Sequence, residues 1–142
     1  MKKLLNIVSR ALGLTLLTMT LVAARPSASI EDIVINRNMD GNSVEGLNIR
    51  VNVENDGTEA LEEPTVRLWV RRNWQENWRL LKTWSNHEDL DAGDTHSHDY
   101  FAYGTGNVDP ALFSEYFEVK AVLISKNQRR EVSKEVFYPP AD

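Results

Sequence analysis

The residues best suited to chemistry lie between positions 87 and 99, where histidines are interspersed with carboxylates. His96 and His98 are two positions apart, so on a β-strand both imidazoles lie on the same face. His87 precedes them in an acidic segment. Imidazoles and carboxylates bind zinc and copper, which makes these three histidines candidate metal ligands. A stable site needs three or four ligands in a defined geometry, and the sequence fixes no third ligand, so a solvated acidic loop without a metal is the favoured interpretation.

The sequence contains no motif for catalysis. It has no cysteine nucleophile, no Gly-x-Ser-x-Gly turn, no glycine-rich phosphate loop and no His-Glu-x-x-His pair. Ser97 lies between two histidines, but adjacent side chains on a strand point to opposite faces, so Ser97 would face away from both. We therefore predict that the protein is not an enzyme and uses no cofactor.

All four tryptophans fall within 16 residues, and three arginines lie among them. Indoles on the outer face of a strand pair would form a flat surface suited to a protein partner or to stacking on sugar rings. Alternatively, Trp69, Trp78 and Trp84 form cross-strand aromatic pairs that only stabilise the sheet. The candidate partner-binding residues are Trp69, Arg71, Arg72, Trp74, Trp78, Arg79 and Trp84.

Residues 1–24 have the pattern of a signal peptide. Three basic residues lie in the first ten positions, and an uncharged, mainly apolar run follows from Ala11 to Ala24. As a helix this run would span about 21 Å, which is shorter than the roughly 30 Å hydrocarbon core of a bilayer and disfavours a permanent span. We expect export to the periplasm or the cell exterior, cleavage after Ala24 (or near Ala28), and a linker over residues 25–29.

The remaining 118 residues suit one acidic domain. Without the three basic residues of the presequence, 13 Lys and Arg remain against 21 Asp and Glu, a formal charge of −8. Such a surface repels nucleic acid and anionic lipid head groups, so neither is an expected partner. The chain has no cysteine, which excludes both a disulfide and an anchor through a lipidated cysteine.

Alternating polar and apolar residues indicate seven β-strands. The clearest stretch runs from Leu47 to Val70 around an Asn-Asp-Gly turn, and it predicts two paired strands with one buried face each. Leu80 and Leu81 make the fourth strand ambiguous, because neighbours cannot share a face. Seven strands without a helical period predict an all-β antiparallel sandwich of immunoglobulin-like type. The predicted strands are 30–36, 46–55, 65–72, 78–84, 95–102, 116–125 and 131–138, with a helical turn at 110–114 and a tail at 139–142.

Four segments occur in an order and at a spacing that resemble a known domain. They are residues 48–57, with a strand and an Asn-x-Gly turn, then 66–70, then the Leu-x-x-Gly-x loop at 90–94, and the strand 117–123. Together they resemble the bacterial cell-adhesion-related (CARDB-like) domains, with Phe117 in place of the usual tyrosine. The resemblance covers roughly residues 30–138 and implies a fibronectin type III-like sandwich that serves as an extracellular binding module and performs no reaction.

The function that these observations favour is non-catalytic binding. We expect an exported immunoglobulin-like module that contacts another protein of the cell envelope or of an extracellular assembly, either as an assembly subunit or as an adhesion module. The alternative is a carbohydrate-binding module that uses the tryptophans as a platform.

Overall fold

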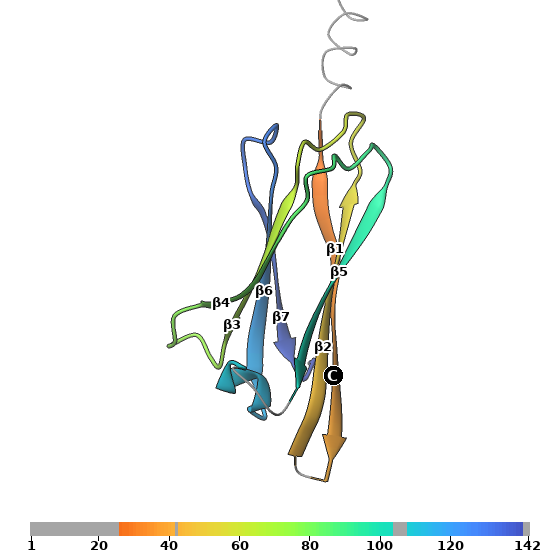
Figure 1. Cartoon of the computed structure of the whole chain (residues 1–142). Helices are drawn as coiled ribbons and strands as arrows, with labels where there is room; N and C mark the ends of the chain where they lie inside the picture. Colours follow the sequence, from red (N-terminus) through yellow and green to blue (C-terminus); the bar gives the residue numbers. More distant parts are fainter. Residues whose placement is uncertain (1–25, 42, 104–107, 141–142) are drawn as a thin grey trace, which may run out of the picture.

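Seven β-strands form two antiparallel sheets that face each other, with one short 3-10 helix at their side (Figure 1). The computed structural model describes residues 26–41, 43–103 and 108–140. One sheet has the order β1-β2-β5 and the other β4-β3-β6-β7. The elements are β1 Ala28–Asp40, β2 Ser43–Asn55, β3 Thr65–Arg71, β4 Arg79–Ser85, β5 Thr95–Tyr103, η1 Pro110–Phe113, β6 Phe117–Ile124 and β7 Val132–Tyr138.

The predicted fold class is confirmed: the domain is an all-β, seven-stranded antiparallel sandwich of immunoglobulin-like type. Each predicted strand is present, and the helical turn is the 3-10 helix η1. The predicted signal peptide at residues 1–24 lies outside the described residues. Among the residues that the structure describes, no helix has the length and hydrophobicity needed to cross a bilayer.

The expectation that residues 46–55 and 65–72 pair with each other is wrong. β2 pairs with β1 and β5, whereas β3 pairs with β4 and β6, so the two strands belong to different sheets. Each carries one apolar face, and the two faces meet across the core instead of lying side by side. The nine residues between β2 and β3 leave enough chain to cross from one sheet to the other.

The core is formed by the alternate positions of both sheets. On β2, Ile49 and Val51 are completely buried, and on β3, Val66, Leu68 and Val70 are as well. Burying a side chain of this kind stabilises the fold by about 1.5–3 kcal/mol. Because inner positions are used for packing, the outward positions of the same strands are free to carry other chemistry.

The first hairpin is longer than the sequence pattern predicts. β1 continues to Asp40, and pairing with β2 persists from Asn38 to Asp40 after a register shift. The sequence predicted that this strand ends at Asn36, because a polar segment with turn residues follows. Asn36 and Asn38 lie on the outer face of the sheet, where polar side chains are compatible with a strand. Gly41 has a φ of +58° at the turn, a conformation that residues with a Cβ seldom adopt.

The Asn55 side chain links the β2–β3 and β4–β5 loops at the end of the sandwich where the described chain begins. Its side chain is completely buried. The amide nitrogen donates to the carbonyls of Glu59 (2.8 Å) and Leu90 (2.9 Å), and the amide oxygen accepts from the Gly57 backbone N–H (3.1 Å). A buried polar side chain is tolerated because its hydrogen-bonding groups are satisfied.

Replacing Asn55 with Ala should lower the free energy of unfolding by about 2–4 kcal/mol, because two backbone carbonyls and one N–H lose their buried partner. Urea denaturation followed by fluorescence measures the change. Asn52→Ala is the control on the outer face of the same strand and should cost less than 1 kcal/mol. Equal losses for the two variants would contradict the role of Asn55.

Candidate functional site

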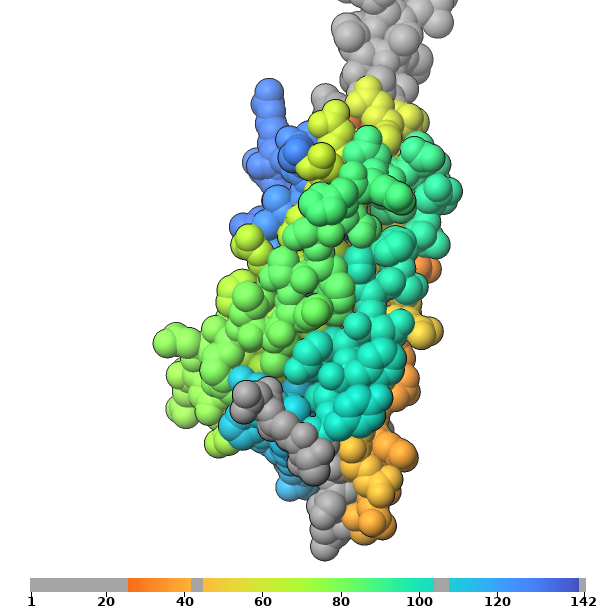
Figure 2. Space-filling view, viewed as in Figure 1, coloured from red at the N-terminus to blue at the C-terminus, as the bar shows by residue number. Residues whose placement is uncertain are grey.

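The β3–β4 hairpin projects from the side of the sandwich and carries the candidate tryptophans (Figure 1, Figure 2). β3 supplies Trp69 and Arg71 on its outer face, opposite the buried side chains of Leu68 and Val70. Trp69 pairs with Leu80 on β4 and with Lys120 on β6. Two of the predicted contact residues therefore share one outward surface with side chains from neighbouring strands.

Trp78 contacts two cations on this outer surface. The guanidinium carbon of Arg71 is 4.1 Å from the Trp78 ring centroid, and the Lys120 ammonium is 4.7 Å from it. Arg71 also forms an ion pair with Glu118, and both side chains are mostly buried. These cation–π contacts stabilise the base of the hairpin.

Trp74 is the most exposed of the four indoles, with 74% of its surface accessible. It lies at the tip of the hairpin, in a turn held by three hydrogen bonds. The Gln75 N–H donates to the Asn73 side chain (2.9 Å), the Glu76 N–H donates to the Asn73 carbonyl (3.1 Å), and the Arg72 N–H donates to the Glu76 carboxylate (3.0 Å). The turn thus presents a large apolar ring to solvent on an ordered backbone.

Arg79 fastens the start of β4 to the 3-10 helix. Its guanidinium donates two hydrogen bonds to the Asp109 carboxylate, at 2.7 and 2.9 Å, and a third to Glu76 at 3.1 Å. Asp109 in turn accepts from the Ala111 N–H at the first turn of η1 (2.9 Å). Hydrogen bonding to Arg79 lowers the pKa of Asp109, so the carboxylate stays charged. Arg79 thereby holds the base of the hairpin in place.

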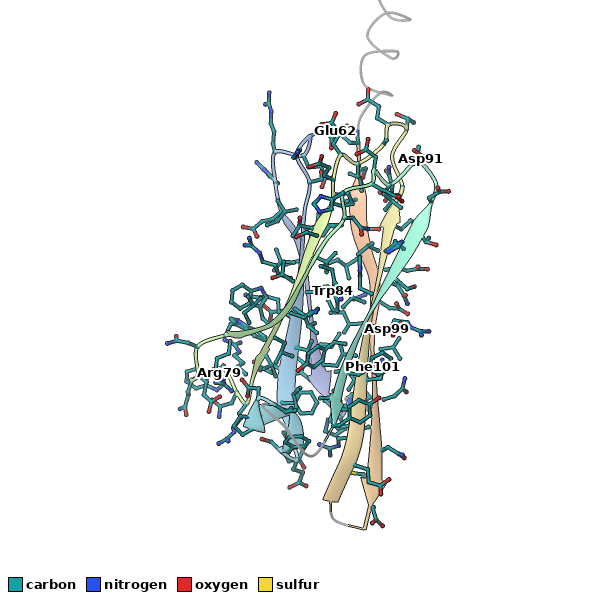
Figure 3. All side chains as sticks on the ribbon, in the orientation of Figure 1. Glu62, Arg79, Trp84, Asp91, Asp99 and Phe101 are labelled. Carbon is teal, nitrogen blue, oxygen red and sulfur yellow. The ribbon has the colours of Figure 1, made fainter. Side chains whose placement is uncertain are left out.

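The structure does not bring Trp84 to the surface that carries the other candidates. Trp84 packs against the core and stacks on His98 of β5, with ring centroids 5.2 Å apart (Figure 3). A register shift after Leu68 in the pairing of β3 with β4 changes which side of β4 faces inward. No two tryptophan rings are in contact among the described residues, so the predicted aromatic pairing is replaced by an indole and imidazole pair.

The two strand histidines share a face, as predicted, and that face points into the sandwich. Their ring centroids are 4.7 Å apart, and His98 is buried. Ser97 points the opposite way, where its hydroxyl bonds the Asn52 side chain. His87 lies apart from them, in a hollow formed with Glu63 and Lys126. Within the described ranges, no three His, Cys, Asp or Glu side chains are placed to hold a metal ion together.

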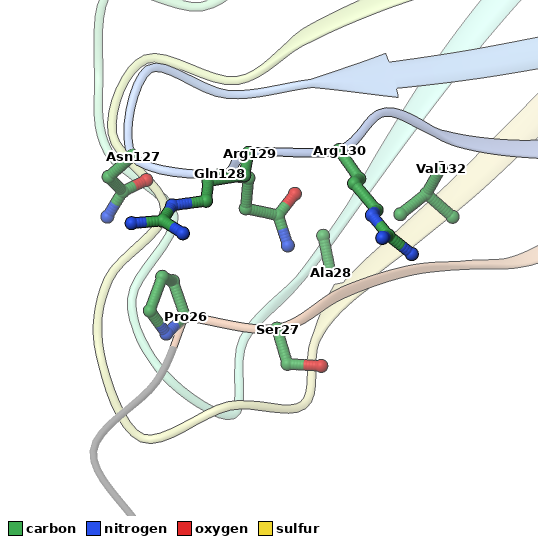
Figure 4. A pocket seen from close by; sticks show the side chains of 8 residues that line it. All are labelled: Pro26, Ser27, Ala28, Asn127, Gln128, Arg129, Arg130 and Val132. Carbon is green, nitrogen blue, oxygen red and sulfur yellow. The ribbon is translucent and has the colours of Figure 1, made fainter. Parts of the chain in front are cut away.

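A hollow with a volume of about 680 Å³ lies beside the start of the described chain (Figure 4). It separates the beginning of β1 from the β6–β7 loop. The described residues that line it include no carboxylate and no histidine, so they offer no acid, base or metal ligand. They are Pro26, Ser27, Ala28, Asn127, Gln128, Arg129, Arg130 and Val132.

Two groups of residues near the candidate sites were not predicted from the sequence. Glu118 and Lys120 complete the Trp78 cluster, and Phe101 and Tyr103 are aromatic rings exposed by 58% and 64% on the other sheet. The alternating pattern of β6 indicates that Glu118 and Lys120 share a face. It does not indicate that β3 is the neighbouring strand. For Phe101 and Tyr103, the weak pattern of β5 gave little indication of which face they occupy.

Comparison with known proteins identifies the fold. No family model matches this sequence, and no curated protein matches it. Among solved structures, the CARDB domain of the PF1109 protein of Pyrococcus furiosus, described in complex with di-metal ions, matches with a TM-score of 0.50 and 14% identity, over 78% of this chain and 86% of that one. The fold is CARDB-like.

This CARDB-like sandwich also matches part of a β-glucuronidase of Bacteroides uniformis, with a TM-score of 0.51 and 17% identity. The alignment covers 78% of this chain but 14% of that one, so this chain spans about a seventh of the enzyme's length. At such identities the likeness concerns the fold alone, and a β-sandwich is a scaffold for many functions.

Replacing Arg71 with Met should lower the free energy of unfolding by about 2–4 kcal/mol, because it leaves the Glu118 carboxylate buried without its partner. Arg67→Met is the control, since Arg67 lies exposed on the same face of β3 and should change stability by less than about 0.5 kcal/mol. Urea denaturation at pH 7 gives both values. Similar losses of unfolding free energy in the two variants would contradict a specific stabilising role for the ion pair between Arg71 and Glu118.

His98 should make the fold sensitive to acid. Burial, with a further contribution from His96, lowers its pKa to about 4, whereas an unfolded histidine titrates near 6.5. Between these values only the unfolded chain binds the proton, so stability falls as the pH drops from 6.5 to 4, by roughly 2–3 kcal/mol. Urea denaturation at pH 7 and pH 4.5 measures the loss, which His98→Leu should reduce. Equal losses in wild type and variant would refute the assignment.

Proposed function

We propose that this chain is an exported, non-catalytic immunoglobulin-like module that binds another protein of the cell envelope or of an extracellular assembly, through the β3–β4 hairpin. The observation that carries the proposal is Trp74, an indole exposed at the tip of a turn held by three hydrogen bonds. Tryptophan and arginine are enriched among the residues that dominate binding energy at protein interfaces. Arg72 lies exposed beside Trp74.

The rigidity of the hairpin supports a binding role. Arg79 ties its base to Asp109, and Arg71 and Lys120 hold Trp78 from below. A preordered anchor loses less conformational entropy on binding than a mobile one does, so more of its contact energy is available for affinity. The sandwich itself gains no stability from Trp74 that would explain an exposed indole at this position.

The distribution of charge also favours the β3–β4 hairpin as the region that binds a partner. Acidic loops, including Glu62 and Asp91, lie at the end where the described chain begins, and Arg79 lies nearer the opposite end (Figure 3). The bridge between Leu61 and Leu90 brings these two loops side by side. The hairpin instead combines an exposed indole with arginines.

The positions of the tryptophans support carbohydrate binding less well than protein binding. Trp69 and Trp78 are only partly exposed, Trp78 already contacts two cations, and Trp84 packs against the core. Trp74 alone offers an open ring, and one ring does not form a platform. A polysaccharide that quenches the tryptophan fluorescence of the wild type, but not that of the Trp74→Ala variant, would support the carbohydrate alternative.

Site-specific photo-crosslinking tests the protein-binding proposal. A photoreactive phenylalanine at position 74 of the full chain, expressed in cells, should give one defined adduct, and the partner identified from it should bind the purified wild type. Trp74→Ala should weaken that binding by about tenfold or more, which corresponds to the energy of an interface hot spot.

The matched control is position 101, where another exposed aromatic side chain lies on the opposite sheet. The photoreactive residue there should give no adduct with the same partner, and Phe101→Ala should bind it normally. The proposal fails if position 74 gives no adduct in cells, or if Trp74→Ala and Phe101→Ala affect partner binding equally.

A further inference from the structure

A second surface, on the outer face of the three-stranded sheet, combines aromatic rings with amides in two cross-strand rows. In one row Asn36 of β1 pairs with Asn48 of β2, which pairs with Phe101 of β5. In the next row Asn38 pairs with Gly46, which pairs with Tyr103. Because the rows are two residues apart, they lie about 7 Å from each other on the same face.

This surface is hollowed, with a volume of about 470 Å³. Gly46 forms its floor, since it contributes no side chain between Asn38 and Tyr103. The nearest heavy atom to a Cβ placed there would be Tyr103 Cδ1, at 3.7 Å, so the tyrosine ring rests beside the glycine. Phe101 and Tyr103 are exposed by 58% and 64%, and both rings are therefore accessible along the edge strand.

The chemistry of the hollow is neutral. Asn36 and Asn38 make no side-chain hydrogen bond to another described residue, so both amides can donate and accept. Asn48 donates to Asp99 (3.2 Å), and Asp99 is neutralised by Arg50 in the adjoining row. The one charged residue in the lining, Arg37, directs its guanidinium away, to the Ser114 carbonyl (2.7 Å) and the Tyr138 ring.

We propose that this Asn36–Asn38–Gly46–Asn48–Phe101–Tyr103 hollow binds a neutral, β-linked oligosaccharide that lies along β5. Two accessible rings in line can each stack on the apolar face of a sugar ring, and amides that both donate and accept match hydroxyl groups, which do the same. The neutral lining complements an uncharged ligand. An extended peptide would instead pair with the backbone at the strand edge, whereas these groups lie on the sheet face.

Isothermal titration of the full chain with cellohexaose tests the proposal, with polygalacturonic acid as the anionic comparison. We expect cellohexaose to bind and polygalacturonic acid not to bind. Tyr103→Ala and Phe101→Ala should each weaken cellohexaose binding by about tenfold, and Gly46→Val should abolish it by filling the floor. Gly46 has no positive φ, so valine fits the strand without backbone strain.

Phe137→Ala and Trp74→Ala are the matched controls, because both remove an exposed aromatic ring outside the hollow. Each should bind cellohexaose as the wild type does, and thermal melting should show that all variants fold. The proposal is overturned if cellohexaose does not bind, if the two controls lose binding as Tyr103→Ala does, or if Gly46→Val binds normally. None of these results depends on the partner contacted by Trp74, so the two proposals can fail separately.

Discussion

The structure depends on one constraint: each sheet must bury one face against the other without help from any disulfide. The chain has no cysteine, so apolar packing between the sheets carries the stability of the sandwich. Inner positions such as Ile49, Val66 and Leu68 are completely buried and admit few changes. Binding chemistry is therefore confined to outward positions and to the loops at the two ends.

The two outward faces carry different chemistry because their neighbours across the strands differ. On the four-stranded sheet, Arg71, Trp78 and Lys120 stack in a cationic and aromatic ladder that supports a projecting hairpin. On the three-stranded sheet, amides alternate with rings around Gly46. A protein contact through the hairpin and a saccharide contact through the hollow would use opposite faces of one rigid scaffold, and neither would disturb the core.

Buried polar groups are accommodated in three ways. Asn55 satisfies its amide with backbone groups of the surrounding loops, and Glu118 is paired with Arg71. His98 has no such partner among the described contacts; it stacks on Trp84 and remains neutral because burial lowers its pKa. The first two stabilise the fold at neutral pH, and the third makes it sensitive to acid.

The alternation of the sequence predicted the strands and their inner faces, because a period of two residues reflects burial on one side of a sheet. It predicted one buried face within Leu47–Val70, where Val66, Leu68 and Val70 are completely buried, and it placed His96 and His98 on one face and Ser97 on the other. Tertiary structure alone decided which strands are neighbours: β2 and β3 face each other instead of pairing, and Asn36, Asn48 and Phe101 form one row although they are far apart in the chain. It also decided which side chains of β4 face inward, a point that the neighbouring Leu80 and Leu81 left ambiguous. A register shift between β3 and β4 leaves Leu80 exposed and turns Trp84 inward, because a bulge reverses the alternation of faces along a strand.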